Sequence, residues 1–242
     1  MFEFATSLMT GHSTNSPQLS IVVPVRNERS LLPQLLRQIP RKKEFELIVV
    51  DGQSTDGSQE YLSRQKQLRL VSSKQGRAVQ QNRGAKDAKG SYLLFLHVDS
   101  QLSTQAWEAL YNAMRKDVAA ACFRLAFDAS HPLLKIAAYG SRWSHLLFRG
   151  GDQGLLIRKE LFHQLKGFDE RYMVCEDLEL IRKLQQKTGL QILPATLTTS
   201  ARRFLKQGVT RTLFHFRVIH FLHWCHFKPK HLRSYYQRWI GH

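Results

Sequence analysis

Carboxylates follow two apolar runs of the sequence. Asp51 ends the run 45–50, and Asp99 follows the run 91–96 with His97 two positions before it. If both runs are parallel strands, these side chains share one cleft beyond the carboxyl ends of the sheet. A carboxylate there suits Mg²⁺ or Mn²⁺ carried by a diphosphate, whereas Asp51 also fits an Asx-turn and His97 fits a packed, hydrogen-bonded histidine.

A second acidic group, Glu176 and Asp177 followed by Glu179, opens a segment with helical periodicity. Acidic residues in a first helical turn are favoured by the helix dipole, and that explains most such clusters. The alternative is that one of the carboxylates, held in a partly apolar pocket, acts as a general base. The residues alone leave both interpretations open.

A glycine-rich loop precedes another short apolar run. Such a loop is either a simple turn or a place where the backbone approaches a sugar or phosphate closely. It begins at Gly150 and continues with Gly151, Asp152, Gln153 and Gly154.

Several basic and amide side chains are candidates for binding phosphate, because a guanidinium group matches phosphate oxygens bidentately. They are Arg77, Asn82 and Arg83 around a predicted helix start, and Arg202 and Arg203 after the run TLTTS.

The elements that position these residues alternate in the first half of the chain. Apolar spacing predicts strands over 21–23, 45–50, 68–72 and 91–96, and helices over 28–39, 56–65 and 78–88. This alternation predicts an α/β fold with a mostly parallel, Rossmann-like sheet and helices on both faces. The second half alternates less regularly: helices are predicted over 104–116, 133–147, 176–187, 209–226 and 230–239, and strands over 120–128, 154–158 and 191–193.

Composition and charge limit the class of protein. The 242 residues are 43% hydrophobic with a net charge of +17, so the chain is a folded domain that suits a polyanionic partner. Three widely spaced cysteines fit a reducing, cytoplasmic compartment rather than a disulfide framework. We expect a polar leader over 1–18, a catalytic domain over 19–205 and a helical extension over 206–242, with no membrane-spanning segment.

The C-terminal region has no acidic residue after Glu179. Its helices either pack on the catalytic domain with a solvated basic face, or lie on an anionic membrane surface with Trp224 and Trp239 at the interface. The same charge and aromatic content would suit a nucleic-acid-binding protein, although no nucleic-acid motif is present.

Taken together, six motifs occur in the order and spacing of a known family. The sequence resembles family 2 glycosyltransferases of the GT-A fold, and most closely the small branch labelled arsenosugar-biosynthesis or radical-SAM/selenodomain-associated glycosyltransferases. The resemblance covers roughly residues 19–225. The motifs are IVVPVRNE, ELIVVDGQSTDGS, GSYLLFLHVDS, GDQG, EDLEL and TTSARR.

The resemblance implies a role for each matching residue. Asp51 matches the acidic residue that contacts the nucleoside, Asp99 the last carboxylate of the metal-binding DxD motif, and Asp177, beside Glu176, the catalytic base. Arg202 or Arg203 would face the pyrophosphate or the acceptor. The first nucleotide-binding loop matches Pro24, Arg26, Asn27 and Glu28.

One position departs from the family pattern. Where many members carry the first Asp of DxD, this chain has His97, so a metal would be held by Asp99 and an imidazole. An imidazole favours Mn²⁺ over Mg²⁺, which leaves the metal and the strictness of metal dependence open.

The hypothesis that follows is an inverting transferase. Asp177 would deprotonate an acceptor hydroxyl that attacks a nucleotide-diphosphate sugar, while a divalent metal and arginines stabilise the leaving diphosphate. The acceptor is unidentified, with lipid-linked compounds and small metabolites both candidates. The alternatives are a nucleic-acid-binding protein and a nucleotidyltransferase or dinucleotide-dependent enzyme, the last disfavoured because no GxGxxG follows the first strand.

Overall fold

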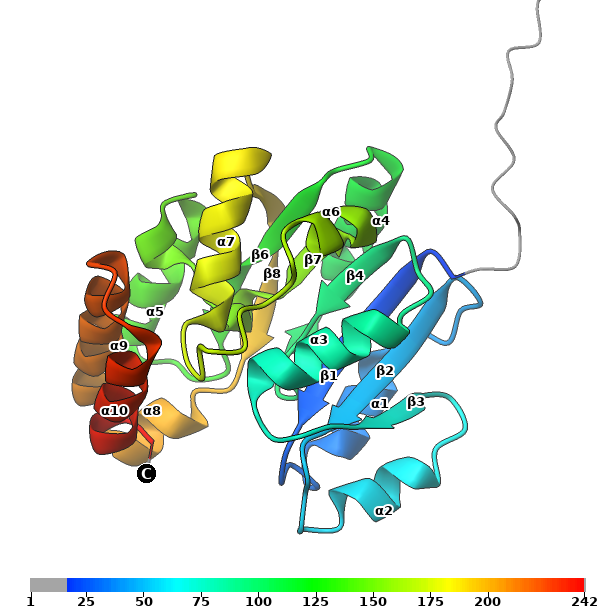
Figure 1. Ribbon diagram of the computed structural model, residues 1–242, viewed down its shortest axis with the longest axis horizontal. Coiled ribbons are helices and arrows are strands. Elements are labelled where there is room, and N and C mark those ends of the chain that lie inside the picture. Colours follow the sequence, from blue (N-terminus) through cyan, green and yellow to red (C-terminus); the bar gives the residue numbers. More distant parts are fainter. Residues whose placement is uncertain (1–16, 242) are drawn as a thin grey trace, which may run out of the picture.

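The structure is a computed structural model that describes residues 17–241. The predicted leader over 1–18 therefore lies almost wholly outside the described residues. Within them, strands form one curled sheet with helices on both sides, which confirms the predicted α/β class (Figure 1).

The sheet has the order β3-β2-β1-β4-β7-β6-β8-β5. The pairs β3/β2, β2/β1, β1/β4 and β6/β8 are parallel, whereas β7 runs antiparallel to both β4 and β6, and β5 runs antiparallel to β8. The sheet is thus mostly parallel, as predicted. The strands are β1 (Leu19–Val25), β2 (Phe45–Asp51), β3 (Arg69–Ser72), β4 (Tyr92–Phe95), β5 (Gln101–Leu102), β6 (Ala120–Phe127), β7 (Leu155–Arg158) and β8 (Gln191–Thr199).

Helices cover the two faces of the sheet and form two apolar layers. Successive residues of β1 point to opposite faces, so that Ile21 and Val23 join the layer under α1, α2 and α4, and Val22 joins the layer under α3, α6 and α7. The helices are α1 (Leu32–Gln38), α2 (Ser58–Ser63), α3 (Arg77–Asp87), α4 (Thr104–Arg115), α5 (Pro132–Tyr139), α6 (Lys159–Gln164), α7 (Glu176–Lys187), α8 (Arg202–Gln207), α9 (Val209–Trp224) and α10 (Pro229–Trp239).

Helix α3 is held close to the strands that carry the first two motifs. A Cβ at Gly84 would lie 2.5 Å from Val22 Cγ1, so only glycine allows this approach. At the carboxyl ends of the strands, the buried amide of Gln80 donates to the carbonyls of Val25 at 2.9 Å and Val50 at 2.8 Å. The ends of β1 and β2 are thereby fixed next to the start of α3.

The predicted helix over 133–147 is wrong in its second half. Helix α5 ends at Tyr139, and short 3₁₀ turns follow at Gly140–Arg142 and Leu146–Phe148. The buried guanidinium of Arg149 donates to the carbonyls of Ser141 and Trp143, which turns this backbone away from a helical path. The apolar spacing of the segment could not reveal that interaction.

Three short elements, β5, α6 and α8, were missed. Two strands extend well beyond their predicted ends: β1 spans residues 19–25 rather than 21–23, and β8 continues to residue 199 rather than ending at 193. Two or six residues are too few to show periodicity. Pro194 within β8 removes a hydrogen-bond donor, which made a continuous strand look unlike one in sequence.

The C-terminal helices pack against the remainder of the fold. Ile219 of α9 and Leu232 of α10 share a buried cluster with Cys175 and Leu178 at the start of α7. Among residues 17–241, no helix is both long and apolar enough to cross a membrane. All three cysteines are unpaired.

Candidate active site

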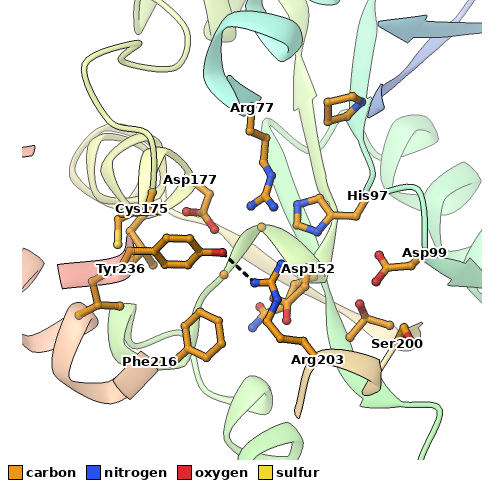
Figure 2. A pocket seen from close by; sticks show the side chains of 18 of the residues that line it. Arg77, His97, Asp99, Asp152, Cys175, Asp177, Ser200, Arg203, Phe216 and Tyr236 are labelled. Carbon is orange, nitrogen blue, oxygen red and sulfur yellow. Dashed lines mark hydrogen bonds between the residues drawn. The ribbon is translucent and has the colours of Figure 1, made fainter. Parts of the chain in front are cut away.

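A cavity of about 920 Å³ opens beyond the carboxyl ends of β1 and β4, under α9 and α10 (Figure 2). Most of the residues that the sequence singled out meet here, although they come from segments far apart in the chain. The predicted site residues that line it are Pro24, Arg26, Glu28, Arg77, His97, Asp99, Gly151, Asp152, Gln153, Asp177, Arg202 and Arg203.

Asp177 and His97 face the same point of the glycine-rich loop. A Cβ built on Gly151 would lie 2.9 Å from Asp177 Oδ2 and 3.1 Å from His97 Nε2. The glycine thus lets the loop pass between a carboxylate and an imidazole. In Figure 2 the side chains of Arg77, His97, Asp152 and Asp177 point toward this common centre.

The start of α7 presents its two acidic residues differently. Cys175, in the left-handed region at φ 64°, precedes the helix, and Asp177 then lines the cavity. Glu176 does not line it: its side chain is buried and its Oε1 lies 3.5 Å from Nη1 of Arg77. Burial raises the pKa of Glu176 to about 7; Arg77 opposes this shift and Asp177 adds to it.

Asp152 is the third acidic group near the centre. Burial first, and then the charges of Asp177 and Asp99, raise its pKa to about 6. Three carboxylates so close together repel one another, and a cation among them would relieve that repulsion. The part of the cavity around these three carboxylates therefore favours binding of a positive charge.

The residues at the predicted metal position fit a divalent cation that a diphosphate helps to hold. Burial, Arg77 and Arg203 keep the pKa of His97 well below its ordinary value, so the imidazole is neutral and can act as a ligand. His97 Nε2 is buried and has no hydrogen-bond partner in the described part of the chain. Within residues 17–241 no three His, Cys, Asp or Glu side chains form a metal site by themselves. Mg²⁺ and Mn²⁺ take remaining ligands from phosphate oxygens and water.

The loops after β1 and β2 are tied together beside the cavity. Thr55 N donates to Asn27 Oδ1 at 2.8 Å, and Ser54 N donates to Asp51 Oδ2 at 3.2 Å. Neither Asn27 nor Asp51 lines the cavity, but Asp51 Oδ1 is buried without a partner among the described residues. Glu28 does line it, in an ion pair with Arg202 at 3.0 Å.

Three predicted residues have structural contacts outside the cavity. Arg83 does not line it, and its Nη2 lies 3.5 Å from Asp87 Oδ2. Asn82 donates to the carbonyl of Phe168 at 2.8 Å and accepts from its N–H at 2.9 Å, which ties α3 to the loop before α7. Gly154, at φ 62°, faces Leu96 and Leu197 in the core.

Sequence reasoning missed the residues that the C-terminal helices bring to the cavity. The hydroxyl of Tyr236 accepts a hydrogen bond from Arg203 Nη1 at 3.1 Å, and in Figure 2 its ring lies beside Asp177 and above Phe216. The absence of Asp and Glu from this region predicted an anionic partner, but the sequence could not show that α10 lies over the cavity. The other lining residues from α9 and α10 are Leu213, Arg217, Ile219, His220, Arg233 and Gln237.

Solved structures with the same fold include several enzymes. A mannosyltransferase from Pyrobaculum calidifontis, in complex with GDP-Man and Mn²⁺, matches 92% of this chain and 70% of its own with a TM-score of 0.65 and 21% identity. Glucosyl-3-phosphoglycerate synthase from Mycobacterium tuberculosis, with Mn²⁺, UDP and glucosyl-3-phosphoglycerate, gives 0.59 at 14% identity over 84% of this chain and 80% of its own. These likenesses show the GT-A fold.

Curated relatives are glycosyltransferases or act in polysaccharide biosynthesis by name. The O-antigen biosynthesis protein RfbC of Myxococcus xanthus is 29% identical over 73% of this chain and 16% of its own length. The poly(ribitol-phosphate) beta-glucosyltransferase of Bacillus spizizenii is 32% identical over 41% of this chain and 18% of its own. The matches thus span less than a fifth of either relative. A PGL/p-HBAD biosynthesis glycosyltransferase of Mycobacterium bovis is 29% identical over 67% of both chains.

The sequence model of one family matches the first part of the fold, which supplies about half of the residues that line the cavity. The model described as glycosyl transferase family 2 matches residues 20–163, which is more than half of the chain and includes β1 to β4, His97, Asp99 and the glycine-rich loop. The chain belongs to glycosyl transferase family 2.

Proposed function

We propose that this chain is an inverting glycosyltransferase, which moves a sugar from a nucleoside diphosphate sugar to an acceptor hydroxyl. One observation carries the proposal: Asp177 at the start of α7, and His97 and Asp99 in the segment after β4, line one cavity together with Arg77 and Arg203. A base, a metal position and cations for a leaving diphosphate are the groups that this reaction needs.

Asp177 has the role of general base. Its carboxylate accepts the proton of the acceptor hydroxyl while that oxygen forms a bond to the anomeric carbon from the face opposite the diphosphate. The bond from the anomeric carbon to the diphosphate oxygen breaks, and the nucleoside diphosphate leaves with the bonding electron pair. Attack from the opposite face inverts the configuration at the anomeric carbon.

The cationic side of the cavity receives the leaving group. Arg203 lines it on α8, and Arg77 lines it on α3 with its orientation fixed by Glu176. Asp99 and His97 would hold Mn²⁺ or Mg²⁺, which when bound neutralises charge that develops on the diphosphate. Asp51 ends β2 beside the cavity without lining it, and its Oδ1, buried and unpartnered among the described residues, is our candidate acceptor for a nucleoside N–H or O–H.

Binding of a panel of nucleotide sugars tests this proposal. UDP-, GDP-, CMP- and dTDP-sugars are titrated calorimetrically with and without Mn²⁺, and the thermal shift of each complex is measured. We expect one nucleotide class to bind with Mn²⁺ and to lose most of its affinity in Asp99→Ala. If none of these donors binds in either condition, the proposal is wrong.

The role of Asp177 is tested separately from binding. Asp177→Asn is expected to bind the donor within a few-fold of the parent affinity and to lose about 10²- to 10⁴-fold in turnover, the usual contribution of a general base. Asp152→Asn, from the same cavity, is the matched control for loss of one negative charge. Near-normal turnover in Asp177→Asn would exclude it as the base.

The finer family assignment remains our prediction from the sequence motifs. It places the chain in the arsenosugar-biosynthesis or selenodomain-associated branch, in a reducing cytoplasmic compartment. Product analysis with the donor that the panel identifies would decide which acceptor class is used.

A further inference from the structure

Seven large apolar side chains are exposed on one part of the surface, formed by α5, the loop after it and α9. The most exposed are Ile136 at 70%, Phe214 at 62% and Trp224 at 58%. We call this set the aromatic face. Its members are Leu133, Ile136, Tyr139, Trp143, Phe214, Phe221 and Trp224.

The two helices contribute to one continuous surface. The ring centroids of Tyr139 and Trp143 are 5.4 Å apart, and those of Trp143 and Phe148 are 5.5 Å apart. The guanidinium carbon of Arg217 on α9 lies 5.5 Å from the centroid of Phe148. This chain of contacts joins the end of α5 to the middle of α9. The helices also meet beneath the surface, where Leu134 and Val209 share a buried cluster.

On α9 the exposed aromatic residues lie opposite the packed side of the helix. Phe214, Phe221 and Trp224 are spaced by seven and three positions, which places them on one stripe. The other side of α9 is buried through Val209, Thr212, Ile219 and His223. Packing of α9 on the fold therefore does not require the aromatic stripe, and contiguous exposed apolar surface of this kind marks an interaction site.

The elements that form the aromatic face carry basic side chains and no acidic ones. Residues 129–151 and 180–242, which include α5, the loop after it, α9 and α10, contain no Asp or Glu. Lys135 and Arg142 stand next to the exposed apolar residues, and the guanidinium of Arg142 lies 4.9 Å from the ring centroid of Tyr139. Aromatic side chains bordered by Lys and Arg match the interface of an anionic lipid bilayer.

We propose that the aromatic face docks on an anionic phospholipid membrane. A nucleic acid is the weaker match, because Leu133 and Ile136 offer it neither stacking nor charge. Trp239, which the sequence suggested as an anchor, instead stacks on His215 with centroids 5.1 Å apart and is not part of the face.

Docking of the aromatic face would also fix how the cavity is oriented relative to the membrane. Ala137 on α5, Phe148 in the following loop and Leu213 and Arg217 on α9 line the cavity, so its wall and the aromatic face are built from the same elements. A membrane held against α5 and α9 would therefore lie next to the cavity. This inference stands independently of the reaction proposed above, because it rests on the surface alone.

Vesicle co-sedimentation of the full chain tests the docking. Vesicles of phosphatidylcholine alone and with about 30% phosphatidylglycerol are compared at low and high salt. We expect binding to the anionic vesicles that weakens as salt is raised. Phe221→Ser combined with Trp224→Ser should reduce this binding about tenfold or more, while the melting temperature stays unchanged because both side chains are exposed.

A matched pair of charge reversals separates docking from net charge. Lys135→Glu with Arg142→Glu changes the charge beside the aromatic face, and Arg64→Glu with Lys66→Glu makes the same change at the end of α2, on the opposite side of the fold (Figure 1). Only the first pair should weaken vesicle binding. Equal weakening by both pairs would overturn the proposal.

Other occupants of the face give other results. Loss of RNA binding, or of a dimer, in the double serine variant without any vesicle binding by the parent chain would overturn the membrane proposal. So would vesicle binding that appears only after residues 1–16 are removed, since that segment would then be what covers the face.

Discussion

Arg77 and Glu176 form an ion pair between α3 and the first residue of α7, with Nη1 and Oε1 3.5 Å apart. Glu176 is 1% exposed, and the neighbouring Asp177 enters the cavity that Arg77 also lines. The ion pair thus holds the guanidinium of Arg77, which lines the cavity, through a buried carboxylate that does not line it. It joins a helix of the family-matched region to the helix that carries the proposed base.

Glu176 makes the stability of the fold depend on pH. In the unfolded chain a glutamate titrates near 4.5, whereas burial raises the pKa of Glu176 in the folded protein to about 7 despite the opposing charge of Arg77. The folded state then binds more protons between pH 4.5 and 7, so this residue lowers stability as pH rises through that window. Glu176→Gln has no proton to lose. The urea midpoint of this variant, relative to that of the parent chain, should rise as the pH is raised from 4.5 to 7. If both midpoints change with pH by the same amount, the raised pKa of Glu176 does not control stability in this range.

Gly151→Ala should abolish activity without unfolding the protein. The new Cβ would lie 2.9 Å from Asp177 Oδ2 and 3.1 Å from His97 Nε2, and both side chains can move away at little cost to the fold. Turnover with the identified donor should fall at least about 10²-fold, because a displaced base loses its alignment.

Gly84→Ala is the contrasting variant. Its Cβ would lie 2.5 Å from Val22 Cγ1 and 2.9 Å from Val50 Cγ2, inside the core between α3 and the sheet. Overpacking there should lower the free energy of unfolding by about 1–3 kcal/mol. Thermal melts and turnover measured on both variants distinguish a role of Gly151 in the site from a role in core packing. Equal loss of stability in both variants would mean that Gly151 is required for packing.

The first half of the fold was predictable because its signals are local. The buried runs at β1, β2 and β4 and the helical spacing between them predicted a parallel α/β arrangement, including the shared edge at which Asp51 ends β2 and beyond which Asp99 follows β4. The second half was not, since β7 lies antiparallel between β4 and β6, and no residue pattern states which strands become neighbours.

The residues of the site also fall into those that the sequence could predict and those that it could not. His97, Asp99 and Asp177 stand out by type and position in the sequence, and they do line one cavity. Tyr236 and Arg149 depend on long-range packing: one reaches the cavity because α10 folds over it, and the other is buried because a loop wraps around it. Asn82 looked like a phosphate ligand, yet its hydrogen bonds go to Phe168 and Glu170.

Arg149 should be essential for the loop between α5 and the glycine-rich motif. It is 1% exposed, donates to the carbonyls of Ser141 and Trp143, and donates to Cys122 Sγ at 2.9 Å. Arg149→Met would leave these carbonyls without donors, at about 1–3 kcal/mol for each buried group. We expect a lower melting temperature and faster proteolysis within 140–150. Arg142→Met, at an exposed arginine of the same loop, is the control and should behave like the parent chain; unchanged stability of Arg149→Met would show that the loop is held by other contacts.

Tyr236 should help to bind the leaving diphosphate by positioning Arg203. Its hydroxyl accepts from Arg203 Nη1 at 3.1 Å, and both residues line the cavity. Tyr236→Phe keeps the ring and its packing but frees the guanidinium, so the KM for the donor should rise several-fold while the melting temperature stays within a degree or two of the parent value. Tyr235→Phe is the matched control: it removes a hydroxyl from the neighbouring position of α10 that bonds His215 Nδ1 at 2.7 Å and does not line the cavity. It should leave the KM unchanged, and an equal effect of both substitutions would assign the hydroxyl of Tyr236 to the packing of α10 rather than to the donor.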